Sequence, residues 1–319
     1  MAVVADFKQL NPIVSGENVR SYCASWPTVV LETVYRSTDE EHLLFLNRIR
    51  QKQPTRDELE EYFHQRHWQH TELDDCIRTG EELAAIRKEP FTWLCVTNKG
   101  AAEVCQAALR THGISQKDLD DGYLCDPSTK SDLRILARPG IMIRLSRNVD
   151  KHRGFVNGAL ARIVESLSGN AVFVAKLESS GNLVLVHPMT EDGAMFLPCC
   201  YGYATTIRRA QGQDLSHGCL YFNQRQVAVR GYGYVGVSRF RTRLGCYLYG
   251  KLRRTDFLPV GEEQADEVLQ RGAMSEDLSS DEEFMPTCYQ PYKTEADEEE
   301  YFDTESERGE VADYGDFDF

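Results

Sequence analysis

Two short segments of this 319-residue chain carry the side chains best suited to chemistry. They are YATTIRRAQGQDL, from Tyr203 to Leu215, and GYVGVSRFRT, from Gly233 to Thr242. Each begins with an apolar, β-prone run and ends in a cluster that includes Arg with Gln, Ser or Thr. At the rim of an α/β sheet, where strands end, such side chains commonly bind phosphate groups. The two segments therefore predict a phosphate-binding site at the edge of an α/β sheet.

Two helices are predicted between residues 40 and 63. The first runs from Glu40 to Gln51 and is amphipathic, with apolar residues that recur every three positions: Leu43, Leu46 and Ile49. The second opens with a capping box, because Thr55 can accept a hydrogen bond from the Glu58 amide while the Glu58 side chain reaches back. Its inward-facing residues are expected to be Leu59, Tyr62 and Phe63.

The run FTWLCVTN, from Phe91 to Asn98, is a short continuous apolar segment. Strands of this kind are buried on both faces of a parallel sheet. A helix is predicted to follow from Lys99 to His112 and to end at Gly113, the usual C-terminal glycine. Strands are also expected at VVLETVY, from Val29 to Tyr35, and at LGCYLYG, from Leu244 to Gly250.

The segment 140–198 has a different pattern. Short apolar runs such as IMIRL and AVFVAKL alternate with turns that contain Gly and Asn. Several short strands joined by tight turns within about 60 residues are typical of a small antiparallel barrel. The sequence therefore predicts an α/β layer that is interrupted by a β-module and then completed.

Charge is distributed unevenly along the chain. Residues 261–319 carry 21 Asp and Glu against 3 Lys and Arg, whereas the first 260 residues carry 33 basic and 29 acidic groups. A mildly basic globular part suits a polyanionic partner. The acidic segment has too little apolar surface to offset its ordering entropy and is expected to be disordered.

The ten cysteines form no CxxC pair, and several lie inside apolar runs, so we expect free thiols in a reducing compartment. His64, His67 and His70 recur every three residues on the helix that opens with the capping box. No cysteine or carboxylate pattern accompanies them, so we interpret them as a polar helix face and expect no metal site. No apolar run approaches the roughly 20 residues of a membrane span. A soluble intracellular protein without a membrane partner is expected; the nucleus is favoured, with cytoplasm and organelles left open.

Six segments, taken in order, resemble the later motifs of superfamily-one DNA helicases, and the Pif and RecD-like group is the nearest match. They are ADFKQLNP (5–12), the Tyr35-Arg36 pair, VTNKGAAEV (96–104), RGFVNGALARIVE (153–165), YATTIRRAQGQDL and YVGVSRFRT. The order and spacing of the six make the resemblance specific, and it covers about residues 1–255. It implies two RecA-like lobes with nucleotide hydrolysis between them.

The resemblance assigns residues to ATP. Arginines aimed at the terminal phosphate stabilise the charge of phosphoryl transfer, and Arg239 and Arg36 stand at such positions. Gln9 matches the γ-phosphate sensor, so these three are the expected catalytic residues. The expected ATP-binding set adds Gln211 and Gly212. Read without the resemblance, Arg36 could be a surface ion-pair residue and Gln9 a loop amide.

Other residues are assigned to single-stranded DNA, the expected partner. They stand at the family's phosphate-contacting positions or in its RGxVNG hairpin: Thr97, Asn98, Arg153, Asn157, Thr206, Arg208 and Arg209. Arg147 and Lys151 belong to the same hairpin region. The adjacent arginines could instead be a solvated charged face. Tyr232, Tyr234, Tyr247 and Tyr249 alternate as strand residues do, so we interpret them as core residues rather than base-stacking platforms.

The chain departs from the family pattern in several places. Ala5 stands where the family has Gly, Arg209 where it has Lys, and Asp214 where it has Thr; an Asp close to a DNA phosphate would repel it. No GxxxxGK[ST] segment is present in the sequence. ATP and Mg²⁺ are therefore expected in the complete motor, with neither bound tightly by this chain alone and no hydrolysis by it. The AVVADF run at the start predicts a further portion upstream.

The predicted fold class is α/β, a RecA-like P-loop NTPase-type second lobe with an inserted SH3-like β-barrel and a disordered acidic tail. The predicted domains are the end of the first lobe (1–27), the second lobe's first part (28–113), the inserted β-module (114–200), the lobe's completion (201–258) and the tail (259–319). The resemblance implies the C-terminal part of an ATP-dependent 5′-to-3′ DNA helicase that couples ATP hydrolysis to strand translocation and duplex unwinding in repair, recombination or replication. The alternative is a non-catalytic nucleic-acid-binding or regulatory protein derived from a helicase, whose acidic tail shields the basic groove or recruits a protein partner.

Overall fold

The computed structural model describes residues 37–69, 71–223 and 230–260. All of them belong to one compact unit. Several predictions concern residues outside the described ones: the segment 5–12 with Gln9, the predicted strand at 29–35, Arg36, His70, Cys23 and the acidic tail. Within the described part, no helix is long and apolar enough to cross a membrane.

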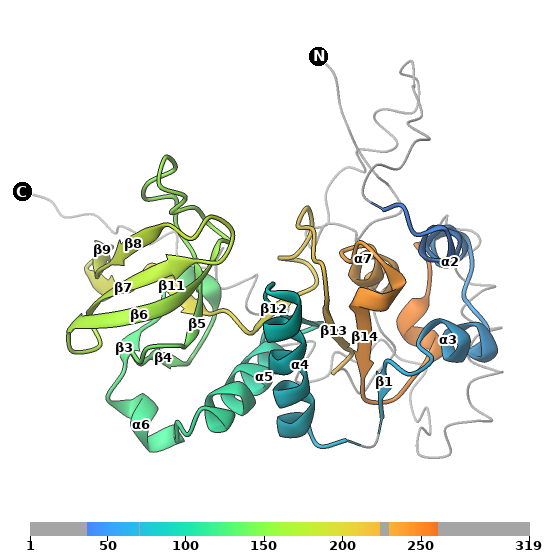
Figure 1. Cartoon of the computed structure of the whole chain (residues 1–319), viewed down its shortest axis with the longest axis horizontal. Helices are drawn as coiled ribbons and strands as arrows, with labels where there is room; N and C mark the ends of the chain where they lie inside the picture. Colours follow the sequence, from blue (N-terminus) through green and yellow to red (C-terminus); the bar gives the residue numbers. More distant parts are fainter. Residues whose placement is uncertain (1–36, 70, 224–229, 261–319) are drawn as a thin grey trace, which may run out of the picture. The chain divides into compact units, whose positions relative to one another are not determined.

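A five-stranded sheet with every neighbouring pair parallel forms the centre of this unit (Figure 1). Its spatial order is β1-β14-β13-β2-β12, from β1 (His67–Trp68), β14 (Cys246–Tyr249), β13 (Gly218–Tyr221), β2 (Thr92–Cys95) and β12 (Ala204–Thr206). Non-consecutive strands lie side by side, as crossover connections require. The predicted α/β fold with a parallel sheet is confirmed.

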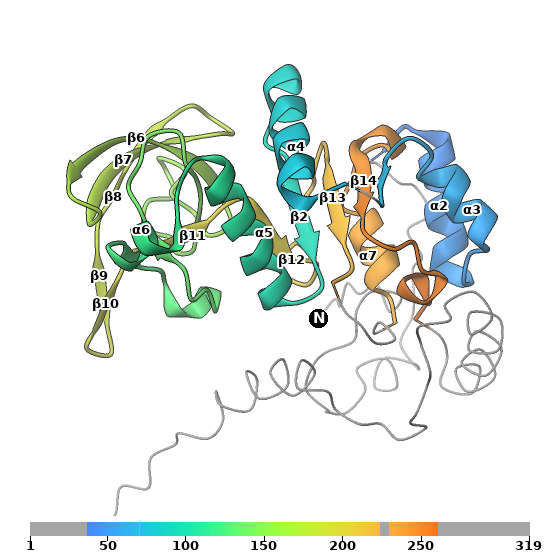
Figure 2. The same ribbon diagram turned by 90° about the horizontal axis from the view of Figure 1, so that it is seen from below.

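Helices cover both faces of the sheet (Figures 1 and 2). One face packs against α4 (Leu73–Arg87) and α5 (Asn98–Thr111), and the other against α2 (Glu40–Gln51), α3 (Arg56–Tyr62) and α7 (Tyr232–Val237). In β2, Trp93 and Cys95 face the first set of helices, while Leu94 faces the second. This alternation explains the continuous apolar run, because both sides of the strand are buried.

The helix predictions are confirmed in position. Helix α2 has the predicted bounds, but its buried face is His42, Phe45 and Ile49, and Leu43 and Leu46 lie at the margin. The Thr55–Glu58 capping box is present at the start of α3. Helix α5 begins with Thr97 as its N-cap, and the backbone at Gly113 has a φ of 70°, which favours glycine. Helix α3 ends at Tyr62, so His67 lies on a strand rather than on this helix.

The prediction that Tyr232 and Tyr234 are strand residues is wrong. They lie in α7. The N-cap of this helix is Gly231, whose backbone is in the left-handed conformation. A Cβ atom at Gly233 would lie 2.6 Å from the Asp256 oxygen, and one at Gly236 would lie 2.7 Å from Leu220. The two glycines let the helix backbone approach its neighbours closely, and this packing overrides the local β preference. The expectation that Tyr232 is a core residue is correct, since it is almost fully buried.

An antiparallel module lies between α5 and the return of the chain to the parallel sheet. Its main sheet has the order β11-β5-β6-β7-β8, from β11 (Cys199–Tyr201), β5 (Met142–Leu145), β6 (Leu160–Ser168), β7 (Val172–Leu177) and β8 (Leu183–Val186). Two hairpin pairs accompany it, β3 (Tyr123–Leu124) with β4 (Arg134–Ile135) and β9 (Met189–Glu191) with β10 (Ala194–Phe196). The module also contains the short helices α6 (Gln116–Asp120) and η1 (Pro127–Thr129), whereas η2 (Arg243–Gly245) and η3 (Arg254–Phe257) lie before and after β14 in the chain. The predicted antiparallel strands are confirmed, and barrel closure remains a prediction.

Candidate nucleic-acid interface

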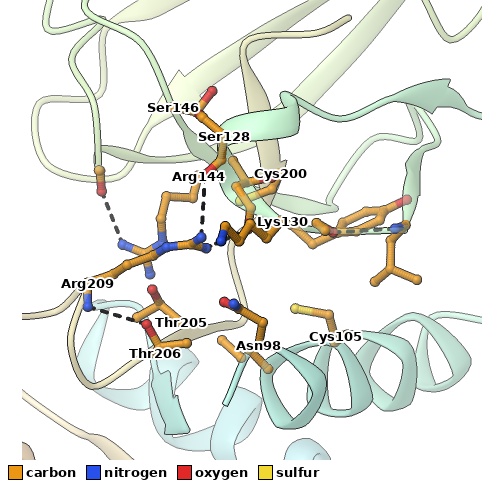
Figure 3. A pocket seen from close by; sticks show the side chains of 18 of the residues that line it. Asn98, Cys105, Ser128, Lys130, Arg144, Ser146, Cys200, Thr205, Thr206 and Arg209 are labelled. Carbon is orange, nitrogen blue, oxygen red and sulfur yellow. Dashed lines mark hydrogen bonds between the residues drawn. The ribbon is translucent and has the colours of Figure 1, made fainter. Parts of the chain in front are cut away.

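A cavity of about 260 Å³ lies where β12, the start of α5 and the antiparallel module meet (Figure 3). Four of the residues predicted to contact DNA line it: Asn98, Asn157, Thr206 and Arg209. They come from three separate stretches of the sequence, and the fold brings them together. Ser128, Thr129, Lys130, Arg144, Ser146 and Thr205 are further polar lining residues.

Local structure explains why these side chains reach the cavity. Strand β12 ends at Thr206, and the chain turns at once, so that the Arg209 amide donates to Thr206 Oγ1 at 3.3 Å. The Arg209 guanidinium then donates to the Thr129 oxygen at 2.5 Å and to the Ser128 oxygen at 3.4 Å. The turn thus directs one arginine across the cavity mouth to the loop around η1.

The neighbouring arginine is directed elsewhere. Arg208 Nε donates to the Tyr232 hydroxyl at 2.9 Å, and its guanidinium lies 5.4 Å from the centre of that ring. The two adjacent arginines therefore have different surroundings, Arg209 at the cavity and Arg208 against α7. The prediction that both hold phosphates of one strand is not tested by these contacts.

Thr97 and Asn98 divide in the same way. Thr97 is the N-cap of α5, accepts from the Gly100 amide at 3.0 Å and from Asn223 Nδ2 at 2.5 Å, and is largely buried. Asn98 follows it and lines the cavity. The structure thus gives Thr97 a capping role that any helix start could require, whereas Asn98 borders the cavity.

The basic residues of the RGxVNG region are not gathered at the cavity. Arg153 is exposed and forms an ion pair with Asp150 at 3.6 Å. Arg147 donates to Asp126 through Nε at 2.5 Å and through Nη2 at 3.0 Å, and also pairs with Glu191. Asn157, in contrast, lines the cavity.

Three of the five residues expected to hold ATP are described. Arg239 is 2% exposed, with Nε donating to the Val235 oxygen at 3.0 Å and Nη2 to Ser238 Oγ at 2.8 Å. Gln211 and Gly212 lie on the turn after β12, where Gly212 has a φ of 84° and an added Cβ would meet no atom within 4 Å. Glycine is required there by the backbone conformation rather than by a close neighbour. None of the three lines the cavity.

The cysteines close to the cavity are neutral thiols. Burial raises the pKa of Cys105 to about 12, and it also raises the pKa of Cys200. All cysteines of the described residues are free. No group of three or more His, Cys, Asp or Glu able to hold a metal ion occurs in the described part of the chain.

Sequence reasoning missed Arg144, because an arginine in the middle of a strand carries no motif. Its neighbours in the segment IMIRL are apolar and buried, and Arg144 is itself 8% exposed. An isolated charge within a buried strand was the available signal, since charged residues are rarely buried without a partner.

No family model matches the chain. The ATP-dependent DNA helicase PIF1 of Danio rerio is 25% identical over 293 residues, which are 84% of this chain and 42% of the relative. The ATP-dependent DNA helicase PIF1 of Xenopus laevis is 24% identical over 278 residues, which are 81% of this chain and 41% of the relative. The chain therefore spans about two fifths of the length of these curated relatives.

Solved structures of Pif1 helicases share the fold. The Bacteroides Pif1 helicase in complex with ADP-AlF3 and single-stranded DNA has a TM-score of 0.53 at 18% identity, covering 78% of this chain and 57% of that one. The Candida albicans Pif1 helicase has a TM-score of 0.52 at 15% identity, covering 77% and 61%. At these identities the likeness concerns the fold.

Proposed function

Because this chain resembles the C-terminal portion of Pif1 helicases, we propose that it provides the second RecA-like lobe and the inserted SH3-like module of a 5′-to-3′ DNA helicase. In the complete motor this lobe would grip single-stranded DNA while ATP hydrolysis drives translocation and duplex unwinding in repair, recombination or replication. The observation that carries the proposal is the convergence of Asn98, Asn157, Thr206 and Arg209 on one cavity. Amide, hydroxyl and guanidinium groups are the donors that proteins use for backbone phosphates.

The charge of the cavity lining supports this proposal. Its described lining includes three cationic residues, Lys130, Arg144 and Arg209, and no acidic one. Asp214, whose position raised the question of repulsion, is exposed and does not line the cavity. Binding at this face would therefore rest mainly on phosphate contacts, which are independent of base sequence and sensitive to salt.

ATP and Mg²⁺ belong to the proposal only through the complete motor. Arg239, whose contacts with Val235 and Ser238 hold it beside α7, is the described residue proposed to act on the nucleotide, with Arg36 and Gln9 as its proposed companions. When bound, the nucleotide would supply the negatively charged phosphate with which the Arg239 guanidinium interacts. The chain's own part is to position that guanidinium.

The proposal predicts that Arg209→Met weakens the binding of a dT12 oligonucleotide by about tenfold, since a charge-assisted phosphate contact contributes roughly 1.4 kcal/mol. The measurement is fluorescence anisotropy with the full chain at several salt concentrations. Arg78→Met is the matched control, because Arg78 lies on the surface of α4 in an ion pair with Asp75. Equal affinities of the two variants would contradict the role of Arg209.

The charge of residues 261–319 favours the second candidate, a regulatory helicase-derived protein whose acidic segment competes with DNA for the cationic face. It predicts that ending the chain after Val260 tightens oligonucleotide binding several-fold at low salt and has little effect at high salt, where the competition is screened. The measurement is the oligonucleotide affinity of both chains at about 20 mM and about 300 mM salt, two concentrations between which the Debye length changes several-fold. Unchanged affinity at low salt would exclude shielding by the tail.

A further inference from the structure

Arg144 is a buried cation whose side chain lacks most of its hydrogen bonds. It lies on β5, between β11 and β6, and is 8% exposed. Nη1 donates to the Gly158 oxygen at 3.2 Å, whereas Nε and Nη2 are buried and have no partner among the described residues. An arginine stays protonated in proteins, so these are unsatisfied donors of a charged group. Such groups are costly to bury unless something pairs with them.

The surroundings of Arg144 add positive charge. Arg209 and Lys130 line the same cavity, and Figure 3 shows the three side chains directed into one region above Asn98 and Thr205. Burial is the main cause that lowers the pKa of Arg144, and repulsion from Arg209 adds to it. The nearby carboxylate of Asp126 already accepts from Arg147, Ser146 and Ser128.

The remaining lining groups suit an oxyanion. Thr205 and Asn98 offer hydroxyl and amide donors beside the cationic centre, and no described lining residue is acidic. A guanidinium with two unsatisfied donors, Nε and Nη2, matches the geometry of a phosphate, which it can bind through two parallel hydrogen bonds. The cavity volume of about 260 Å³ leaves room for such a group.

We propose that this cavity is a phosphate-binding subsite in which Arg144 is the principal ligand, assisted by Arg209 and Lys130. The identity of the occupant rests on the proposed function: if the chain binds single-stranded DNA, the occupant is a backbone phosphate of that DNA, bound in the cavity below the protein surface. Arg144 would anchor one phosphate of the strand at a fixed depth, while the exposed residues contact its neighbours. Inorganic phosphate presents the same chemistry and is the simplest probe.

The test measures the effect of phosphate on the Tm of three full-length chains: the wild type, Arg144→Met and the control Arg138→Met. Methionine removes the charge while it keeps an unbranched side chain, and Arg138 is a half-exposed arginine outside the cavity that pairs with Asp118. We expect phosphate to raise the Tm of the wild type and of Arg138→Met by mass action, with at least tenfold weaker binding in Arg144→Met. General salt effects on stability cancel, because they are common to all three chains.

The variant is expected to fold, because it removes an unsatisfied buried charge; without phosphate its Tm should equal or exceed that of the wild type. For the dT12 oligonucleotide, we expect at least tenfold weaker binding by Arg144→Met and a salt slope smaller by about 0.7, the value of one lost single-strand phosphate contact.

An equal phosphate response in the wild type and Arg144→Met would overturn the inference. Loss of the phosphate response with unchanged oligonucleotide affinity would support the anion site and assign it to a free phosphate rather than the strand. A wild type that responds to phosphate but does not bind the oligonucleotide would refute the proposed function and leave the anion site standing.

Discussion

Replacement of Gly218 by alanine is expected to destabilise the protein by about 3 kcal/mol, the upper part of the range for overpacked core sites. Gly218 opens β13, where it lies opposite Thr92 of β2. A Cβ atom there would lie 2.0 Å from the Thr92 oxygen and 3.1 Å from Phe240 Cε1. The first neighbour is backbone within the parallel sheet and cannot rotate away. The two central strands would have to separate.

Urea unfolding of the full chain, followed by tryptophan fluorescence, measures this change as a lower transition midpoint with an unchanged slope. Gly140→Ala is the matched control, since Gly140 has a φ of 89° but no atom within 4 Å of the added Cβ. Left-handed strain alone should cost about 1 kcal/mol. If the two variants have equal midpoints, the spacing of β2 and β13 is less constrained than the contacts indicate.

Replacement of Asp126 by alanine is expected to destabilise the protein by about 3 kcal/mol, because it leaves buried donors and a cation without their acceptor. The carboxylate is fully buried and accepts from Ser146 Oγ at 2.6 Å, from the Ser128 amide at 2.9 Å and from Arg147 through two nitrogens. It joins the loop around η1 to the end of β5. Because Arg209 donates to that same loop, the change should also weaken oligonucleotide binding.

The same carboxylate predicts a pH dependence. Burial alone would raise the pKa of Asp126, but the hydrogen bonds from Arg147, Ser146 and Ser128 outweigh it and leave the pKa below 3.8. A lowered pKa in the folded state contributes stability that is complete above the unfolded value and is lost as the pH falls through the folded value. The wild type should therefore lose stability from about pH 5 downward more steeply than Asp126→Asn.

The measurement compares the urea unfolding midpoints of the wild type and Asp126→Asn from about pH 3 to about pH 7, the range in which a carboxylate titrates. Asp121→Asn is the control, because Asp121 is exposed and should change stability by less than about 0.5 kcal/mol. Parallel pH profiles of the wild type and Asp126→Asn would show that ionisation of Asp126 does not contribute to the pH dependence of stability.

Predictions that depend on near neighbours along the chain agree with the structure. The capping box at Thr55 and Glu58, the 40–51 helix and the buried strand before Thr97 each follow from residues within a few positions of one another. Local hydrogen bonding and side-chain periodicity are enough to specify such elements. On α2, Ile49 is buried as predicted, but His42 and Phe45 pack inward in place of Leu43 and Leu46. His42 bonds there to Tyr62 and to the Phe240 oxygen.

Predictions that depend on distant contacts were less complete. The apolar, tyrosine-containing run 232–237 favours a strand by composition, but close packing on η3 and β13 makes it a helix. Arg147 has the charge of a DNA ligand, yet Asp126, twenty-one positions away, accepts its hydrogen bonds. Arg144 has no motif at all, and only its burial next to Arg209 gives it a proposed role.

The sequence by itself determined the α/β class, several of the helices and strands, and the residue types from which a phosphate site could be built. These depend on periodicity, capping and composition, which are local properties. Only the tertiary structure decided that Asn98, Asn157, Thr206 and Arg209 share a cavity, that Arg208 turns away from it and that Arg144 lies buried within it. The physical reason is that burial and convergence arise from crossover connections and strand pairing between distant segments, and short-range patterns do not encode which of those contacts form.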